Sequence, residues 1–243
     1  SKYYNLVGFH DSDKFNSIQV QDKFNYKFFE SSEKLIKKCD VIDIVTPTDS
    51  HHKIAIMAIK NKCHVFIEKP ISKTLNEAKE IIKIANLNNV YGQVGHVERF
   101  NPAFIAARSH VQNPMFIESH RLSEFNPRGT DVPVVLDLMI HDIDIILSIV
   151  NSPVRSVNAS GIKVISASPD IANARIEFMN GCVANLTASR ISMKNMRKTR
   201  FFQRDAYVSI DFLSKSTEIV KIKDLSTKID TMGMILENAE GEK

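Results

Sequence analysis

The 243-residue sequence lacks any apolar stretch long enough to cross a membrane, and its first residues lack the basic-then-apolar pattern of a secretory signal. It has only three cysteines, Cys39, Cys63 and Cys182, which lie far apart and form no C-x-x-C pair. Isolated thiols of this kind are typical of proteins in a reducing compartment rather than of a disulfide framework. These absences predict a cytoplasmic protein whose cysteines are reduced and mostly buried.

A large excess of charge of one sign is also absent, because 32 basic and 28 acidic residues leave a formal net charge of only +4. Nucleic-acid binding calls for a basic stripe with interleaved aromatic side chains. The densest basic segment, residues 194–204, carries five basic residues, and this density favours a solvated strand edge or an anion site. We therefore expect neither nucleic acid nor a membrane among the partners.

The first hundred residues alternate between short apolar runs and segments with helical periodicity. Such runs predict strands that are buried on both faces, as in a parallel sheet. The strands are expected at 6–9, 41–45, 64–67 and 90–94, and the helices at 32–38, 50–61 and 74–88. The last helix begins at Thr74-Leu-Asn-Glu77, a capping box. Strand–helix–strand repetition predicts a Rossmann-like, doubly wound parallel α/β sheet.

A dinucleotide-binding sheet normally carries a G-x-G-x-x-G turn after its first strand, and this sequence contains no such motif. The first apolar run is instead followed by Asp11, an acidic residue of the kind that follows the second strand and binds ribose hydroxyls. We therefore expect the first strand to precede Ser1, so that residues 1–100 form an N-terminally incomplete dinucleotide-binding domain. An acidic turn residue is more often simply solvated, and this alternative stays open for Asp11.

The second half follows a different pattern, and the domain boundary is expected near Asn101. Pro102 opens a predicted helix to about residue 111, and another is predicted at 135–150. After Pro153, polar and apolar residues alternate as in half-exposed, largely antiparallel strands, and Met179-Asn-Gly181 predicts a hairpin turn. Strands are expected at 154–161, 172–178, 182–190, 198–203, 206–212 and 217–222.

Polar residues gather where the predicted parallel strands end, which is the edge at which open α/β sheets bind their ligands. They are Asp11, Thr46-Pro47-Thr48 with His51, Glu68-Lys69-Pro70, and Gly95 to Pro102 with Arg99 and Asn101. Each has an ordinary alternative, such as a strand terminator, a helix cap for His51 or a solvated pair for Glu68 and Lys69. Their common position at one edge favours a ligand site.

Lys69 is the most informative of these residues, because it directly follows a buried apolar run. Pro70 restricts the Lys69 backbone to the extended region. A lysine held in this way can donate a hydrogen bond to a substrate oxygen.

The helix expected at 135–150 is apolar almost all round, which predicts burial, yet Asp137, His141, Asp144 and Ser148 form one narrow polar stripe on it. Asp137 and His141 lie one turn apart, at about 5–6 Å between Cβ atoms. A carboxylate that orients an imidazole suits a general base for an alcohol proton. Two alternatives stay open: a satisfied buried polar network, and a metal site of Asp137, His141 and Asp144.

Taken together, these residues resemble the glucose–fructose oxidoreductase/inositol dehydrogenase (Gfo/Idh/MocA) family over nearly the whole chain. The specific parts are Glu68-Lys69-Pro70 and Asp137-Leu-Met-Ile-His141-Asp-Ile-Asp144, in this order and spacing. The resemblance implies an N-terminal Rossmann domain and, at 101–243, a substrate-binding α+β domain with an open, mostly antiparallel sheet. It also implies C-terminal helices after about Lys223, so that this domain is expected to be C-terminally incomplete, and a homodimer or homotetramer formed through the sheet.

The resemblance further implies an oxidoreductase that transfers hydride between a sugar hydroxyl carbon and NAD. Asp11 favours NAD over NADP, because a 2′-phosphate would meet its carboxylate. Lys69 would polarise the oxygen, His141 would take the hydroxyl proton and Asp137 would orient His141. Cofactor binding is implied for Asp11, Thr46, Pro47, Thr48, His51, Glu68, Lys69 and Gly95.

Within the family, the segments around Gly95–Pro102, Arg121–Asp137 and Ser189–Arg197 look most similar to those of UDP-N-acetylglucosamine 3-dehydrogenases, which implies a UDP-linked N-acetylhexosamine oxidised at C3. Arginine supplies the bidentate, charge-assisted donors that a diphosphate needs. Substrate binding is therefore expected of Arg99, Asn101, Arg121, Arg128, Asp137, His141 and Arg190. Arg121 ends a predicted strand, and Arg190 is the easiest to explain as a surface residue. The alternatives are an oxidoreductase of a free, inositol-like sugar or polyol, and a non-catalytic NAD(P)-binding regulator on the same fold.

Overall fold

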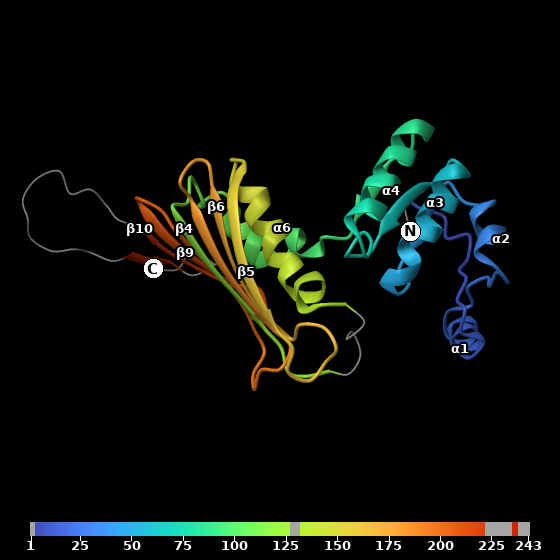
Figure 1. Cartoon of the computed structure of the whole chain (residues 1–243). Coiled ribbons are helices and arrows are strands. Elements are labelled where there is room, and N and C mark those ends of the chain that lie inside the picture. Colours follow the sequence, from blue (N-terminus) through green and yellow to red (C-terminus); the bar gives the residue numbers. More distant parts are fainter. Residues whose placement is uncertain (1–2, 127–131, 222–234, 238–243) are drawn as a thin grey trace, which may run out of the picture. The chain divides into compact units, whose positions relative to one another are not determined.

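The computed structural model describes residues 3–126, 132–221 and 235–237, and the chain divides into two compact units, Ser1–Gly95 and His96–Lys243 (Figure 1). Each unit has a hydrophobic core of its own. No helix in the described ranges is long and apolar enough to cross a membrane. A parallel sheet in the first unit and a mostly antiparallel sheet in the second confirm the predicted fold class.

The first unit contains a three-stranded parallel sheet in the order β1-β2-β3, with helices in the connections. Its elements are α1 (Lys14–Phe24), α2 (Ser32–Ile36), β1 (Val41–Ile44), α3 (Thr48–Lys60), β2 (His64–Ile67), α4 (Leu75–Asn88) and β3 (Gly92–Val94). Ile44 lies opposite Ile67, and Ile67 lies opposite Val94, so the carboxyl ends of all three strands lie at one edge. This is the edge at which the polar loops were expected.

One face of the parallel sheet is covered by α3 and α4. Ile42 and Ile44 of β1 and Val65 and Ile67 of β2 are buried in the same cluster as side chains of both helices. The alternate residues of β1, including Asp43, are exposed. The expectation that these strands are buried on both faces is therefore wrong for the described residues, because an apolar run does not reveal how many faces are covered.

The start of the first unit also differs from prediction. Residues 6–9 form no strand, because Phe9 makes only one isolated parallel bridge, to Phe28, and a strand needs consecutive pairs. Helix α1 follows, and it was not predicted because its apolar residues lack helical spacing. The available signal was Asp13, which caps the helix by accepting hydrogen bonds from the backbone N–H groups of Phe15 and Asn16.

The capping box at the start of α4 is confirmed. The Thr74 hydroxyl accepts a hydrogen bond from the Glu77 backbone N–H at 3.3 Å, and the Glu77 carboxylate accepts one from the Thr74 backbone N–H at 2.9 Å. The two bonds satisfy backbone donors that the first helical turn leaves without partners, so they fix where α4 begins.

The second unit contains an eight-stranded sheet in the order β11-β10-β9-β8-β4-β7-β6-β5, in which β4 and β7 are parallel and all other neighbours are antiparallel. Its helical elements are the 3₁₀ turn η1 (Val97–Phe100), α5 (Pro102–Arg108), the π-helical turn η2 (Val135–Met139) and α6 (Ile140–Ile149). Its strands are β4 (Phe116–Leu122), β5 (Val154–Ile162), β6 (Ile171–Phe178), β7 (Val183–Ser189), β8 (Met196–Phe202), β9 (Ala206–Asp211), β10 (Ser216–Lys221) and β11 (Ile235–Glu237).

Helices α5 and α6 pack on one face of this sheet, and Figure 1 shows α6 lying along it. Ile145 and Ile146 of α6 are fully buried against sheet residues such as Leu186 and Phe201. Alternate residues of β4, β6 and β7 are buried, and the residues between them are half-buried or exposed on the opposite face. The predicted alternation in 172–178 is confirmed, and within the described residues the helices of this unit pack on one face of the sheet only.

The loop between β5 and β6 folds around the buried side chain of Asp170. Its carboxylate accepts hydrogen bonds from the backbone N–H groups of Val164, Ile165 and Ser166 at 2.8, 2.8 and 2.9 Å. These bonds hold the pKa of Asp170 well below its usual range. The ionised carboxylate therefore ties the loop to the first residues of β6.

We predict that Asp170 makes the stability of the intact protein depend on pH. Because its pKa is lower in the folded than in the unfolded state, its contribution is fully present above the unfolded value of about 4 and is lost as the pH falls below that value. Urea unfolding at several pH values should show that Asp170→Asn lowers stability at pH 7 and reduces the loss of stability on acidification. The exposed Asp22→Asn variant is the control, and identical pH profiles for the two variants would contradict the prediction.

Candidate functional site

Three polar loops leave the carboxyl edge of the parallel sheet. The Glu68 backbone N–H donates to the Ile44 carbonyl at 3.0 Å, and the Gly95 N–H donates to the Ile67 carbonyl at 2.8 Å. The hydrogen-bond pattern of the sheet thus continues one residue beyond β2 and β3. It brings the loops that begin at Val45, Glu68 and Gly95 to the same edge, as expected from the sequence.

One feature of this edge, at Thr46, fits a bound polar ligand, and another, at Gly95, concerns how closely the loops pack. The Thr46 hydroxyl is buried and has no hydrogen-bond partner among the described residues, which is costly unless a ligand or water supplies one. A Cβ on Gly95 would lie 3.2 Å from both carboxylate oxygens of Glu68, so glycine allows the Glu68 side chain to pack closely against this backbone. Thr48, also expected to bind cofactor, begins α3 and is almost fully buried.

His51 was expected to bind cofactor, but the structure gives it another role. The ring is 1% exposed, and its nitrogens lie 2.8 Å from the carbonyl oxygens of Pro70 and Thr46. Backbone carbonyl oxygens from two different loops thus face both nitrogens of the ring. The ring therefore braces the β1–α3 loop against the β2–α4 loop and has no nitrogen left for a ligand.

Glu68 and Lys69 are both half-buried at the end of β2. The Lys69 backbone N–H lies 3.3 Å from the Glu68 carboxylate and donates to it. Partial desolvation of its carboxyl group and the nearby charge of Glu68 raise the pKa of Asp43 on β1, although the residue is still exposed. Two carboxyl groups, those of Asp43 and Glu68, therefore lie near this end of β1 and β2, where they can accept hydrogen bonds from hydroxyl groups.

Asp11 lies outside the three-stranded sheet, in the turn before α1. Its carboxylate accepts a hydrogen bond from the Asp13 backbone N–H at 2.8 Å, which is the geometry of an Asx turn. The alternative role of Asp11, as a turn residue, is therefore the one that this hydrogen bond shows. Its second carboxylate oxygen remains for a ligand.

In the second unit, Asp137 lies in the π-helical turn η2 and His141 in the first turn of α6, and both are half-buried. Single π turns inside helices are frequent at functional sites. The other residues of the predicted stripe have partners of their own. The Ser148 hydroxyl donates to the Ile145 carbonyl, and Asp144 accepts from Arg99 Nε and Nη2 at 2.7 and 2.6 Å.

The alternative of a metal site at Asp137, His141 and Asp144 receives no support. The described ranges contain no group of three or more histidine, cysteine, aspartate and glutamate side chains that could hold a metal ion. Instead, hydrogen bonds to Asp144 raise the pKa of Arg99, and His96 Nδ1 lies 3.7 Å from the same carboxylate. Asp144 is thus part of an ion-paired network with η1.

Arg121 was expected to bind substrate, but it is 2% exposed. Its Nε and Nη2 donate to Asp142 at 3.1 and 2.8 Å, and its Nη1 donates to Glu98 at 3.4 Å. Burial alone would lower the pKa of Arg121, but Asp142 and Glu98 outweigh it, so the pKa is raised. A guanidinium enclosed in this way is not available to a ligand. Asp142 was missed because it lies off the stripe, among apolar residues.

The remaining substrate-binding expectations also change. Arg190 is 4% exposed and donates to the Val132 carbonyl at 2.7 Å, so its interpretation as a surface residue is wrong. Asn101 caps α5 by accepting from the Ala103 backbone N–H, and it donates to the Phe212 carbonyl. Arg128 lies outside the described residues. Arg99, with a side chain that is 48% exposed, remains the accessible candidate.

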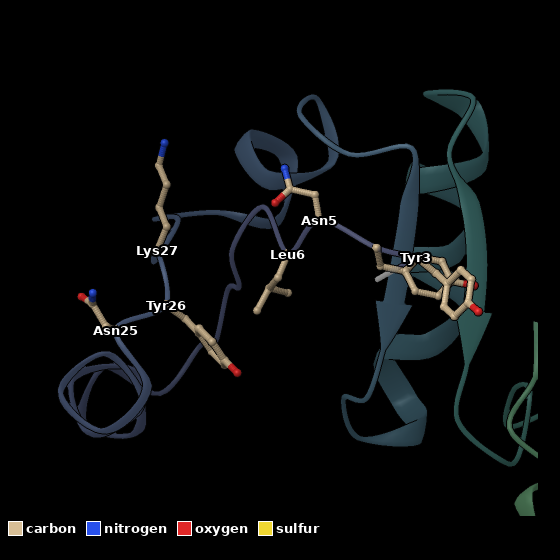
Figure 2. Close-up of a pocket in the computed structure, with 7 residues that line it drawn as sticks. Tyr3, Asn5, Leu6, Asn25, Tyr26 and Lys27 are labelled. Carbon is tan, nitrogen blue, oxygen red and sulfur yellow. The ribbon is translucent and has the colours of Figure 1, made fainter. Parts of the chain in front are cut away.

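A hollow of about 630 Å³ lies elsewhere in the first unit, and none of the predicted site residues lines it. In Figure 2, Leu6 and Tyr26 point to the same side, and Lys27 points away from them. The residues that line the hollow are Tyr3, Tyr4, Asn5, Leu6, Asn25, Tyr26 and Lys27. Lys27 is the one charged residue among those that line the hollow.

Comparison with known families assigns both units. The model of an oxidoreductase family with an NAD-binding Rossmann fold, GFO_IDH_MocA, matches residues 1–96. The model of the GFO/IDH/MocA C-terminal domain matches residues 91–206. The two matches together cover most of the chain and follow the order of the two units.

Individual relatives agree with this assignment. UDP-N-acetylglucosamine 3-dehydrogenase of Acidithiobacillus ferrooxidans is 34% identical over 215 residues, which are 88% of this chain and 69% of that protein. A solved structure of the same enzyme has a TM-score of 0.87 at 32% identity and covers 96% of this chain and 74% of that one. The NAD(+)-dependent scyllo-inositol 2-dehydrogenase of Bacillus subtilis is 28% identical over 63% of this chain and 49% of that protein.

The brace formed by His51 leads to a prediction about stability. His51→Ala would remove the ring that lies between the Thr46 and Pro70 carbonyls, so the free energy of unfolding should fall by about 2 kcal/mol. Its neighbour His52 has only a partly exposed pair with Glu80, so His52→Ala should cost well under about 1 kcal/mol. Urea unfolding of both variants measures the difference, and equal costs would show that His51 is not a brace.

Proposed function

This chain belongs to the Gfo/Idh/MocA family of oxidoreductases with an NAD-binding Rossmann fold, and from that premise we propose that it oxidises a UDP-linked N-acetylhexosamine at C3 with NAD. The observation that carries the proposal is the match to a UDP-N-acetylglucosamine 3-dehydrogenase across both units, at 34% identity over 88% of the chain. Several features of the two units support it.

The loops at the carboxyl edge of the parallel sheet fit the cofactor. The unpartnered Thr46 hydroxyl is a feature that a bound dinucleotide would use. Asp11 would bind the ribose hydroxyls and would repel the 2′-phosphate of NADP, which favours NAD. When bound, NAD supplies the acceptor for the hydride. The residues proposed to hold it are Asp11, Thr46, Pro47, Thr48, Glu68, Lys69 and Gly95, with His51 bracing their loops.

The acid–base roles go to Lys69, Asp137 and His141. Lys69 is half-buried at the end of a buried strand, which suits a donor of one hydrogen bond to the substrate oxygen. His141 is half-buried at the start of α6 and accepts the hydroxyl proton in this proposal. Asp137, one turn earlier, orients the imidazole.

Arg99 is the proposed phosphate ligand. Its Nε and Nη2 hold Asp144, so one edge of the guanidinium is fixed while about half of the side chain is exposed. A fixed, exposed guanidinium is well suited to a diphosphate. Arg121 and Arg190 are excluded from this role by burial, whereas Arg128 stays a candidate outside the described residues.

We also propose that the chain forms a homodimer or homotetramer through the face of the eight-stranded sheet that is opposite α5 and α6. Phe116, Phe202 and Tyr207 form a row of aromatic rings on that face, with centroids 5.8 and 5.2 Å apart. The next row carries the Arg200–Glu118 ion pair, at 3.0 Å. Aromatic side chains beside a paired arginine are typical of interface cores.

We predict that the intact protein produces NADH when it is given UDP-N-acetylglucosamine or its N-acetylgalactosamine epimer. Free N-acetylglucosamine and myo-inositol should be poor substrates, because neither carries a diphosphate for Arg99. UDP should compete with the substrate, and NAD should be used more efficiently than NADP. Absorbance at about 340 nm, where the reduced cofactor absorbs, measures each reaction.

Two outcomes would count against this assignment in different ways. Activity on the uncharged sugars alone, unaffected by UDP, would exclude the sugar nucleotide and leave an oxidoreductase of a free sugar or polyol. Binding of NAD without turnover of any of these substrates would favour a non-catalytic regulator on the same fold.

A second prediction tests Lys69 directly. Lys69→Met should lower kcat by about 10²-fold or more, the usual scale for one acid–base group, while the Kd for NAD changes much less. Lys79→Met, an exposed lysine on α4, is the matched control and should leave kcat unchanged. If Lys69→Met keeps near-normal turnover, Lys69 is not catalytic.

A further inference from the structure

In the hydrophobic core of the second unit, two positions that the alternation of polar and apolar residues assigns to apolar side chains carry opposite charges. On α6, Asp142 lies on the same stripe as Ile145, Ile146 and Ile149, which face the sheet. On β4, alternate residues face the core, and the last of them is Arg121. Binary patterning asks for a hydrophobic side chain at both positions, so this charge pair needs an explanation.

The geometry of the pair is highly constrained. Both side chains are buried, at 2% and 3% exposure, and the carboxylate of Asp142 accepts from both Nε and Nη2 of Arg121. The third nitrogen, Nη1, reaches Glu98 of η1, and the guanidinium carbon lies 5.9 Å from the centre of the Phe212 ring. The planar fork thus has contacts on several sides and tolerates little rotation.

Stability alone does not account for such a pair. Burying two charges costs about as much as their attraction returns, and apolar replacements of similar volume are often as stable or more so. A row of isoleucines and leucines lets a helix settle in neighbouring rotations of similar energy. A guanidinium group that donates two hydrogen bonds to one carboxylate fits only one rotation of the helix and one position of the helix relative to the strand. The Arg121–Asp142 pair therefore fixes the position of α6 relative to β4.

The residue whose position is specified in this way is the neighbour of Asp142. His141 precedes it directly, and the π turn η2 lies immediately upstream. A π turn changes the angular spacing of residues around the helix axis. The direction in which His141 points therefore depends on contacts made by the residues that follow the turn. Downstream, Asp144 holds Arg99 of η1. The helix is thus anchored on the carboxyl side of His141.

We propose that Arg121 and Asp142 are positioning residues, which fix the rotation of α6 and thereby the direction in which His141 presents its imidazole. The proposal rests on the proposed function, because it takes His141 to be the general base. Neither Arg121 nor Asp142 contacts the substrate in this account, and they act only through the helix.

The decisive variant is the double replacement Arg121→Met with Asp142→Leu in the intact protein. Each single replacement leaves one buried charge uncompensated and is expected to unfold readily, whereas the double replacement removes both charges and leaves Glu98 its ion pair with Arg197. We expect the double variant to melt within a few degrees of the wild type, with kcat lowered at least about tenfold and KM little changed, because small misplacements of a catalytic group are costly. Lys34→Met, which removes an exposed pair with Glu30, is the control.

Arg121→Lys adds a test of the fork itself. Lysine keeps the positive charge but lacks the planar donors, so it should not restore kcat if position is what matters. Normal kcat in Arg121→Lys, or in the double variant at wild-type stability, would overturn the proposal and leave the pair a purely structural role.

A readout that does not require turnover separates this proposal from the proposed function. In NMR spectra at fixed pH, the His141 imidazole cross-peak, assigned with His141→Gln, should shift in the double variant and stay in place in Lys34→Met. An unmoved cross-peak in the stably folded double variant would refute the positioning role. A shifted cross-peak in a protein that oxidises none of the tested sugars would support positioning while the proposed function fails.

Discussion

In a parallel sheet the chain leaves every strand at the same edge, the carboxyl edge. Each connection must then cross one face of the sheet before the next strand begins. The order β1-β2-β3 imposes this constraint on the first unit. It forces the segments after Ile44, Ile67 and Val94 together, although they are more than 20 residues apart in sequence. The polar residues of these segments therefore gather at one edge of the sheet. The helices in the connections pack on one of its faces.

The same edge shows how short loops are kept in place without a core of their own. His51 comes from the first turn of α3, and its ring reaches the carbonyl groups of two different loops. An imidazole that is enclosed by backbone oxygen atoms holds the two loops at a fixed separation. The cost of burying it is offset because both nitrogens have partners, and a ligand that spans the loops meets an edge that is already ordered.

How far the sequence predicts this structure depends on where each residue finds its partner. The capping box at Thr74 and the alternation in 172–178 depend on neighbours a few residues away, and both were predictable. The segment 6–9 failed as a strand because pairing is decided by residues near Phe28. Helix α1 was missed because only its Asp13 cap, and no periodicity, marks it.

The candidate site follows the same division. The loops at the sheet edge and the helix that carries His141 follow from local patterns, and they lie where they were expected. The roles of Arg121 and Arg190 could not be read in this way, because their partners Asp142 and Val132 are 21 and 58 residues away. Arginine is so rarely buried that exposure is the reasonable expectation for each one alone. Only the folded chain shows which guanidinium groups are enclosed and which, like that of Arg99, reach solvent.

A general base has to satisfy two opposing requirements: its position must be fixed, and its ring must stay accessible to a substrate. Burial would fix the ring of His141 but would also close it off, and the ring is in fact only half-buried. Rigidity must then come from the backbone that carries it. Asp142 and Asp144 provide this rigidity from the residues that follow, because each is held by an arginine from another element of the same unit. The charges in this core therefore lie where an accessible side chain needs an immobile helix beneath it.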